Sequence, residues 1–330
     1  MTEKKDGFFL FAKKRGPTSF VSLAEIKRAL SEKKIGHTGT LDSFASGLLV
    51  VCAGRFTRFA SHISAFDKSY EAILFFGEET DTLELTGSTI KTAPLPMKDD
   101  FLSACKKFVC SYEQTPPLFS AIHIDGKRAS ALMRSGERFE MPKRNVTIHS
   151  IKVFNTKENA DGRLIVAHIF CKVSKGTYIR SLARDLAREA GSVAHLIALR
   201  RMSVGNFLLS DAYNANELPP FTIDEALKAQ TQKMYSFQKV NDIEKGKTAL
   251  HNFLLPMTER FAEQCGFEIV HLREKFFNHF LHAKKLSDEL FFETSIPTNK
   301  TLAIFSERKN FLALIEKNAD GWRYVFLYAR

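Results

Sequence analysis

The sequence predicts a protein of mixed class that contains both α-helices and β-strands. Residues 164–173 place an apolar side chain at every second position, which is the pattern of a strand with one face in a core. Residues 179–190 instead repeat apolar side chains every three or four positions, as an amphipathic helix does. With 330 residues, 44% of them hydrophobic, the chain is long enough for a main domain and a smaller one.

The N-terminal region is predicted to form one strand followed by one helix. Residues 7–12 are a continuous run of mostly apolar side chains, typical of a buried strand. A turn at Gly16-Pro17 leads into the helix, which Ser19 or Ser22 could cap. Its expected buried stripe has helical spacing and consists of Phe20, Leu23, Ile26 and Leu30.

The middle of the chain is predicted to alternate between strands and helices. Alternating apolar residues predict strands at 70–76, 144–154 and 164–173. Helices are predicted at 98–107, before Gly136, between Gly176 and Gly191, and within 222–230. The acidic stretch 77–87 has the composition of a loop and is expected to face away from RNA phosphates.

The pattern weakens after Tyr213, and we place a domain boundary near Lys233. Residues 1–232 would form the main, catalytic domain and residues 233–330 a small C-terminal one. Within the second part we expect helical stretches at 250–264 and 272–285, followed by strands up to the C-terminus.

The charge balance favours a polyanionic partner. The formal net charge is +11 and the isoelectric point is near 9.3, which suits nucleic acid, although a merely basic protein is an alternative. Five cysteines without a Cys-x-x-Cys pair indicate reduced thiols, and no His-Glu-x-x-His motif indicates a metal. The sequence shows no membrane span and no signal peptide, so a cytoplasmic protein is expected. No cofactor is expected either.

The segment from Lys34 to Arg58 is the most informative stretch. Three glycines, Gly36, Gly39 and Gly47, are expected to require positive φ or a close approach, and an apolar run at 48–52 would anchor the loop. A single acid, Asp42, lies between them. An acid in a glycine-rich loop is most often a turn former or helix cap, but it can also be a positioned nucleophile.

The residues of this segment resemble a known family motif, and this resemblance favours the nucleophile. The run HTGTLD at residues 37–42, followed by small residues, two leucines and GRFTR, resembles the active-site motif of the TruB family of tRNA pseudouridine synthases. The resemblance implies an α+β fold with a mixed, largely antiparallel sheet, plus a C-terminal domain that is PUA-like but divergent. It also implies conversion of a uridine in the T-loop of tRNA, position 55 by family analogy, to pseudouridine.

The resemblance carries over three catalytic roles. Asp42 would be the nucleophile. Arg180, which ends the segment SKGTYIR, would hold the charge of Asp42, because an opposite charge favours an ionised acid. Tyr70 would stack on the target uracil and take part in proton removal.

The resemblance also implies three residues that contact the RNA. The target base would be flipped out of its stack. His37 would contact displaced nucleotides, while Tyr178 and Leu199 would line the pocket around the base. The partner would be the T stem-loop of tRNA, with no obligate protein partner and a monomeric enzyme. A tRNA-binding folding chaperone with little turnover is the alternative function.

Two of the departures from the family pattern concern prolines. The motif usually reads Asp-Pro, where this chain has Asp42-Ser43, and a Lys-Pro-x-Gly segment is replaced by residues 13–16. Loss of a proline loosens a loop by roughly 0.4–1 kcal/mol through the unfolded state. The basic side chains expected to contact the RNA backbone are Lys13, Lys14, Arg15, Arg55, Arg58, Arg200 and Arg201.

Overall fold

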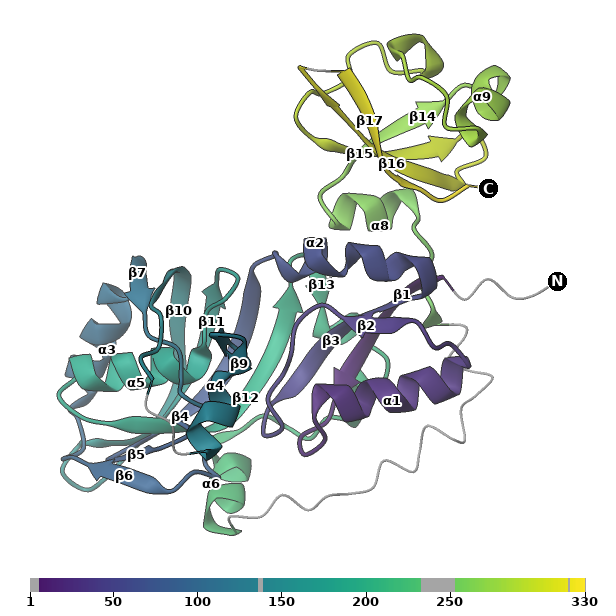
Figure 1. Ribbon diagram of the computed structural model, residues 1–330. Coiled ribbons are helices and arrows are strands. Elements are labelled where there is room, and N and C mark those ends of the chain that lie inside the picture. Colours follow the sequence, from purple (N-terminus) through teal and green to yellow (C-terminus); the bar gives the residue numbers. More distant parts are fainter. Residues whose placement is uncertain (1–5, 136–138, 233–252, 320, 330) are drawn as a thin grey trace.

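The computed structural model describes residues 6–135, 139–232, 253–319 and 321–329, and its centre is a nine-stranded sheet (Figure 1). The strand order is β1-β3-β12-β4-β11-β10-β7, with β2 paired to β3 and β13 paired to β12. These strands are β1 Gly7–Lys13, β2 Ile35–His37, β3 Ser46–Ala53, β4 Lys68–Phe76, β7 Ser111–Gln114, β10 Arg144–Glu158, β11 Leu164–Val173, β12 Ala194–Val204 and β13 Phe207–Leu208.

The pairing in this sheet is antiparallel except at one place. Strands β12 and β3 run parallel where Arg200 faces Ser46 and Arg201 faces Gly47. The sheet is therefore mixed and largely antiparallel, as the resemblance to the TruB family implied. The predicted α+β class is confirmed.

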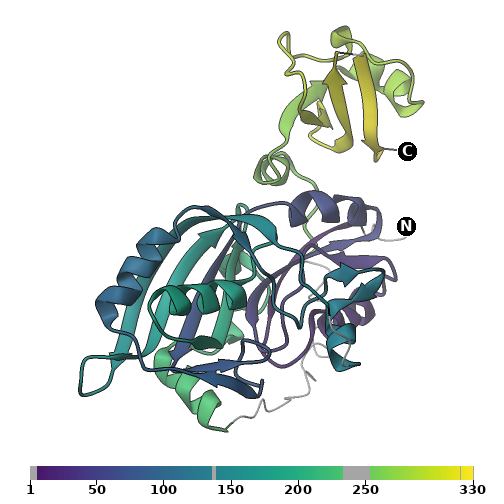
Figure 2. The same cartoon turned by 60° about the vertical axis from the view of Figure 1, so that its left-hand side comes forward.

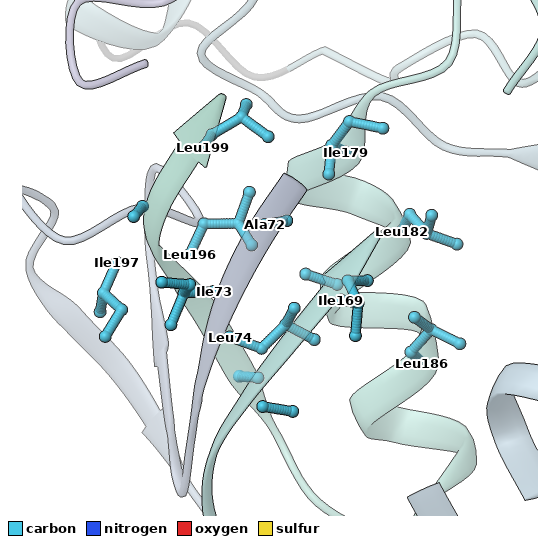
Figure 3. Packing of buried hydrophobic residues seen from close by; sticks show 14 of the residues in the cluster. Ala72, Ile73, Leu74, Ile169, Ile179, Leu182, Leu186, Leu196, Ile197 and Leu199 are labelled. Carbon is cyan, nitrogen blue, oxygen red and sulfur yellow. The ribbon is translucent and has the colours of Figure 1, made fainter. Parts of the chain in front are cut away.

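Four helices of this part occur where the sequence predicted them: α3 Lys98–Lys107, α4 Ala129–Arg134, α5 Ile179–Glu189 and α6 Ile223–Gln232. Figure 3 shows that Ile179, Leu182 and Leu186 of α5 point towards the apolar side chains of the sheet. The alternating face of β11 lies in the same cluster, with Ile169 at 1% exposure. The apolar face of β11 and the apolar stripe of α5 thus pack in one core. The other short helices here are α2 Ala60–Ser64 and the 3-10 helix η1 Gly54–Phe59.

Helix α1, Ser19–Leu30, begins differently from the prediction. The N-cap is Thr18, whose side chain accepts a hydrogen bond from the backbone N–H of Val21. Ser19 instead faces inward, where its hydroxyl bonds to the backbone of Leu41. Because successive helical residues are turned by about 100°, this orientation puts Phe20 outside, and its side chain is 75% exposed. The expectation that Phe20 is buried was wrong.

The acidic stretch 77–87 is not a plain loop. It contains strand β5, Glu78–Thr80, which pairs with β6, Thr89–Thr92, directly after the stretch, and it buries Leu83 and Leu85. The carboxylate of Glu79 lies 2.8 Å from Arg188 of α5. Since the stretch packs against α5, it forms part of the wall of the main domain.

The C-terminal region forms a separate four-stranded sheet, of order β14-β15-β16-β17. Its strands are β14 Glu268–Leu272, β15 Thr301–Ser306, β16 Phe311–Asn318 and β17 Gly321–Leu327. Figure 2 shows this sheet standing beyond helix α8, Glu259–Gln264, which lies against the main part. The rings of Phe261 on α8 and Phe8 on β1 stack with centroids 4.2 Å apart. The boundary expected near Lys233 lies outside the described residues.

Both helical stretches expected in this region, 250–264 and 272–285, are only partly helical among the described residues, and residues 250–252 lie outside them. Leu255 pairs with Phe8 of β1 instead of entering a helix, and Pro256, which has no N–H to donate, follows it. Of the segment 272–285, a 3-10 turn and the five-residue helix α9, Phe277–Leu281, are helical, while Leu272 ends β14.

Three global features complete the fold. All five cysteines are free, and four of them are buried. Among the described residues, no helix combines the length and apolarity that crossing a membrane requires. The same part of the chain holds no group of three or more His, Cys, Asp or Glu side chains that could bind a metal ion.

Candidate active site

The loop that carries Asp42 connects β2 to β3 and is tied down from inside the protein. The side-chain nitrogen of Lys13, the last residue of β1, lies 3.1 Å from the carbonyl oxygen of Asp42 and 2.7 Å from that of Ala45. A third hydrogen bond runs from this nitrogen to the carbonyl of Lys14. Lys13 is fully buried, so these carbonyl groups replace water as its partners.

Two further contacts fix the loop on either side of Asp42. The hydroxyl of Ser19 accepts a hydrogen bond from the N–H of Leu41 and donates one to its carbonyl. The carbonyl of Ser43 accepts a hydrogen bond from the N–H of Gly16, at 2.8 Å. The serine that replaces the usual proline is therefore held through its backbone.

Close packing of β3 against β12 explains one of the glycines. Gly47 has φ +112°, and a Cβ atom there would lie 2.4 Å from the carbonyl oxygen of Arg201. This position therefore admits only glycine. Positive φ, one of the two reasons expected for a glycine here, is not found at Gly36, which lies in β2 with open space where a Cβ would point.

The carboxylate of Asp42 meets the guanidinium of Arg180. The Nε atom of Arg180 lies 2.9 Å from Oδ2 of Asp42, and Nη2 lies 3.3 Å from Oδ1. The side chain of Arg180 is 7% exposed and that of Asp42 is 39% exposed. The acid is thus held by a buried cation on one side and remains open to a ligand on the other.

The remaining donors of Arg180 are used for its own positioning. Nη1 donates to the carbonyl of Thr82 at 2.8 Å, and Nη2 donates to that of Phe119 at 3.0 Å. Arg180 lies in the first turn of α5, where the helix dipole disfavours a cation. The carboxylate and the two carbonyl groups offset that disadvantage.

Tyr70 projects from β4 into the same region and is 9% exposed. Burial raises the pKa of its phenol, while a hydrogen bond from Arg201 and the positive charge of that residue oppose the rise. The negative charge of Asp42 also acts on the phenol. The structure therefore brings Asp42, Arg180 and Tyr70 together, although they lie far apart in the sequence.

His37 and Tyr178 lie at the margin of this centre. The Nδ1 atom of His37 accepts a hydrogen bond from the N–H of Gly39 at 3.3 Å. Burial and the charge of Arg201 lower the pKa of His37. Tyr178 precedes the first residue of α5, its N–H donates to Oε1 of Gln114, and burial raises the pKa of its phenol.

Leu199 provides an apolar wall. It lies on β12 opposite Ala72 of β4 and is 6% exposed. Figure 3 shows Leu199 at the same end of the apolar cluster as Ile179, the first residue of α5. Tyr70 and Leu41 belong to this cluster as well.

Two buried cations of the site were misjudged from the sequence. Lys13 and Arg201 were expected to contact RNA phosphates, but they are 0% and 2% exposed. Burial lowers the pKa of Lys13 to about 7, against the attraction of Asp42. Arg201 donates to the carbonyl groups of Leu48 and Gly39. A lysine at the end of the apolar run 7–12 was the signal that could have identified the first of them.

Comparison with known proteins identifies relatives of the chain. A family model described as TruB family pseudouridylate synthase (N terminal domain) matches residues 27–179. The tRNA pseudouridine synthase B of Treponema denticola is 41% identical over 86% of this chain and 85% of that protein. The corresponding protein of Treponema pallidum is 31% identical over 97% of this chain and 96% of its own length.

Solved structures show the same fold. An H/ACA RNP bound to a substrate RNA containing 2′-deoxyuridine includes a chain with a TM-score of 0.64 and 18% identity, over 98% of this chain and 85% of that one. A Cbf5–Nop10–Gar1 complex gives a TM-score of 0.62 at 20% identity, over 98% of this chain and 84% of that one.

Proposed function

The chain belongs to the TruB family of pseudouridylate synthases, and on that basis we propose that it isomerises a uridine in the T-loop of tRNA, position 55 by family analogy. Asp42 is the proposed nucleophile. The observation that carries this proposal is the contact between a half-exposed Asp42 and a buried Arg180, at 2.9 Å.

The reaction requires few groups. The bond from ribose C1′ to uracil N1 breaks, the base turns, and a bond from C1′ to C5 forms. The proton of C5 leaves and N1 gains one, so the overall change is an isomerisation without an oxidant. A carboxylate can form the transient covalent bond to the nucleotide, and one acid suffices because uracil leaves more readily than a sugar alkoxide.

Arg180 favours the ionised form of this carboxylate and fixes its orientation. The guanidinium and the carboxylate form an ion pair with one hydrogen bond, from Nη2 to Oδ1, and such charge-assisted contacts are stronger than neutral hydrogen bonds. Because the carbonyl groups of Thr82 and Phe119 hold the same guanidinium, the pair is oriented before the substrate arrives.

Tyr70 offers its ring as a surface for the detached uracil. Its raised pKa keeps the phenol neutral at pH 7, so a role as base requires help. Arg201, whose positive charge lowers the pKa of this phenol against the effect of burial, is the residue that supplies such help.

The pocket residues suit a base that has been turned out of its stack. Extrusion of a base costs a few kcal/mol, which stacking on aromatic and apolar side chains offsets. Tyr178 and Leu199 provide such surfaces near Asp42, and His37, with its lowered pKa, is a neutral hydrogen-bonding group for a displaced nucleotide.

The test uses a T stem-loop transcript that carries tritium at C5 of its uridines. The proposal predicts tritium release by the wild type, and no release when the target uridine alone is replaced by cytidine. Tight binding of the wild-type transcript without tritium release would contradict the proposal and favour a tRNA-binding chaperone.

A further inference from the structure

We propose that a basic pocket between η1 and β17 binds a phosphate group of the tRNA, at a second site remote from Asp42. We name it the seam pocket; its lining residues are Lys34, Arg55, Arg58, Phe326 and Leu327. The identity of its ligand rests on the proposed tRNA substrate.

Backbone contacts build the pocket from three segments of the chain. Lys34 precedes β2, and its carbonyl accepts a hydrogen bond from the N–H of Gly54 at 2.7 Å, which places it beside η1. The guanidinium of Arg55 on η1 donates to the carbonyl groups of Leu327 and Tyr328, both at 2.6 Å. The pocket thus spans the junction of the main sheet with the C-terminal sheet, which Figure 1 shows at the end of the η1–α2 segment.

Three of the five residues that line the seam pocket are cations. The guanidinium of Arg58 lies 5.7 Å from the ring centroid of Phe326, and that of Arg55 lies 5.5 Å from the same centroid. The side chains of Lys34 and Arg58 are exposed, and within the described part of the chain neither makes a hydrogen bond or an ion pair.

Two carboxylates near the pocket bind backbone N–H groups and form no ion pair with its cations among the described residues: Glu32 accepts from the N–H of Lys34 at 2.7 Å, and Asp6 from that of Arg55. Asp6 also interacts with the phenol of Tyr328. Three cations that line one cavity create a positive potential that attracts an anion. Lys34 and Arg58, whose side chains make no hydrogen bond or ion pair with the described residues, have N–H groups available to donate to its oxygens.

The size and position of the pocket select the ligand. The cavity has a volume of about 190 Å³, below the roughly 300–1,000 Å³ of typical small-molecule sites, and it suits a single phosphate group. Strand β3 runs from Ser46, near Asp42, to Ala53, directly before η1. At ~3.3 Å per residue this separates the two sites by roughly 25 Å. A nucleic acid that follows the surface presents phosphates at both places.

The experiment measures tRNA binding by the full chain at several salt concentrations. The double variant Lys34→Ala/Arg58→Ala should reduce the slope of log Kd against log salt by about two, because each phosphate contact contributes about one. Its Kd at low salt should rise about tenfold or more. The rate of tritium release at saturating tRNA should be unchanged, because the pocket does not touch the Asp42 loop.

Two controls separate the pocket from general charge and from folding. Lys152→Ala/Lys172→Ala removes the same charge at exposed positions, paired with Phe170 and Ser150 on the sheet face opposite the core residues of β10 and β11. This control should retain the wild-type Kd and slope. Lys34→Ala alone, at an exposed side chain without an internal polar partner, should show half of the slope change with an unaltered melting temperature.

An unchanged Kd in the double variant, or an equal loss in the Lys152/Lys172 control, would overturn the second site. These results are independent of the proposed reaction. Tritium release by the wild type with no effect at Lys34 and Arg58 refutes the pocket alone. Loss of tRNA binding in the double variant while the wild type releases no tritium refutes the reaction alone.

Discussion

The side-chain nitrogen of Lys13 donates a hydrogen bond to the carbonyl oxygen of Asp42, at 3.1 Å. The carboxylate of the same aspartate is bound by Arg180. Two buried cations, one from the end of β1 and one from the start of α5, therefore hold the backbone and the side chain of one residue. The position of Asp42 is thus set by the fold on both sides of the site.

The burial of Lys13 predicts a stability difference that depends on pH. Its pKa is about 7 in the folded chain and near 10.5 when exposed. The unfolded chain therefore binds one more proton between these values, so stability rises with pH from about 7 to about 10.5 and is independent of this group below about 7. In urea unfolding, the free energy of unfolding of the wild type, measured relative to that of Lys13→Met, should increase by a few kcal/mol from pH 7 to pH 10. An identical difference at both pH values would contradict this.

Replacement of Arg180 should affect the reaction more than binding. Arg180→Met removes the ion pair with the carboxylate and its one hydrogen bond, an interaction worth about 1.5–3 kcal/mol, so the rate at saturating tRNA should fall about 10- to 100-fold. Because Arg180 is 7% exposed, the Kd for tRNA should change less than about threefold. Arg180→Lys keeps the charge without the fork geometry and should show an intermediate rate. Equal losses of rate and affinity would mean that Arg180 contacts the RNA.

The approach of β3 to β12 gives a prediction with an internal control. Gly47→Ala places a Cβ 2.4 Å from a backbone oxygen at a φ of +112°, so the free energy of unfolding should fall by about 2–4 kcal/mol. Gly36→Ala, with nothing within 4 Å of the added atom, should change it by less than about 1 kcal/mol. Chemical denaturation measures both variants, and similar values for the two would refute the packing argument.

The exposure of Phe20 is tested in the same way. Phe20→Ala should alter the free energy of unfolding by less than about 0.5 kcal/mol, because this side chain is 75% exposed. Leu23→Ala, three residues further along the same helix and 6% exposed, should cost about 2–5 kcal/mol. A cost at Phe20 as large as that at Leu23 would show that the ring is buried in solution.

Periodicity predicted the central elements well because they carry long apolar patterns. The alternation in 164–173 and the stripe from Ile179 to Ala190 correspond to β11 and α5. The start of α1 failed because a serine hydroxyl can bond to a distant backbone: Ser19 turns inward to Leu41. No local pattern reports such a contact. In the C-terminal region Leu255 pairs with Phe8, so tertiary pairing overrides the helical pattern.

The sequence pointed to the candidate residues of the site through a motif, but it did not reveal what supports them. Asp42, Tyr70 and Arg180 were named, and the cation in the first turn of α5 indicated a nearby carboxylate. Lys13 and Arg201 were read as surface charges, since charged side chains are rarely buried without partners. Their partners are backbone carbonyl groups, which a sequence does not distinguish from any others.

The role of Asp42 is tested most directly by tritium release from C5 of the T-loop uridine. Asp42→Asn keeps the shape of the side chain and removes the charge that attacks the nucleotide. The proposed mechanism predicts that this variant binds tRNA within about threefold of the wild-type affinity and releases no tritium above background. Tritium release by Asp42→Asn at a tenth of the wild-type rate or faster would contradict an aspartate nucleophile.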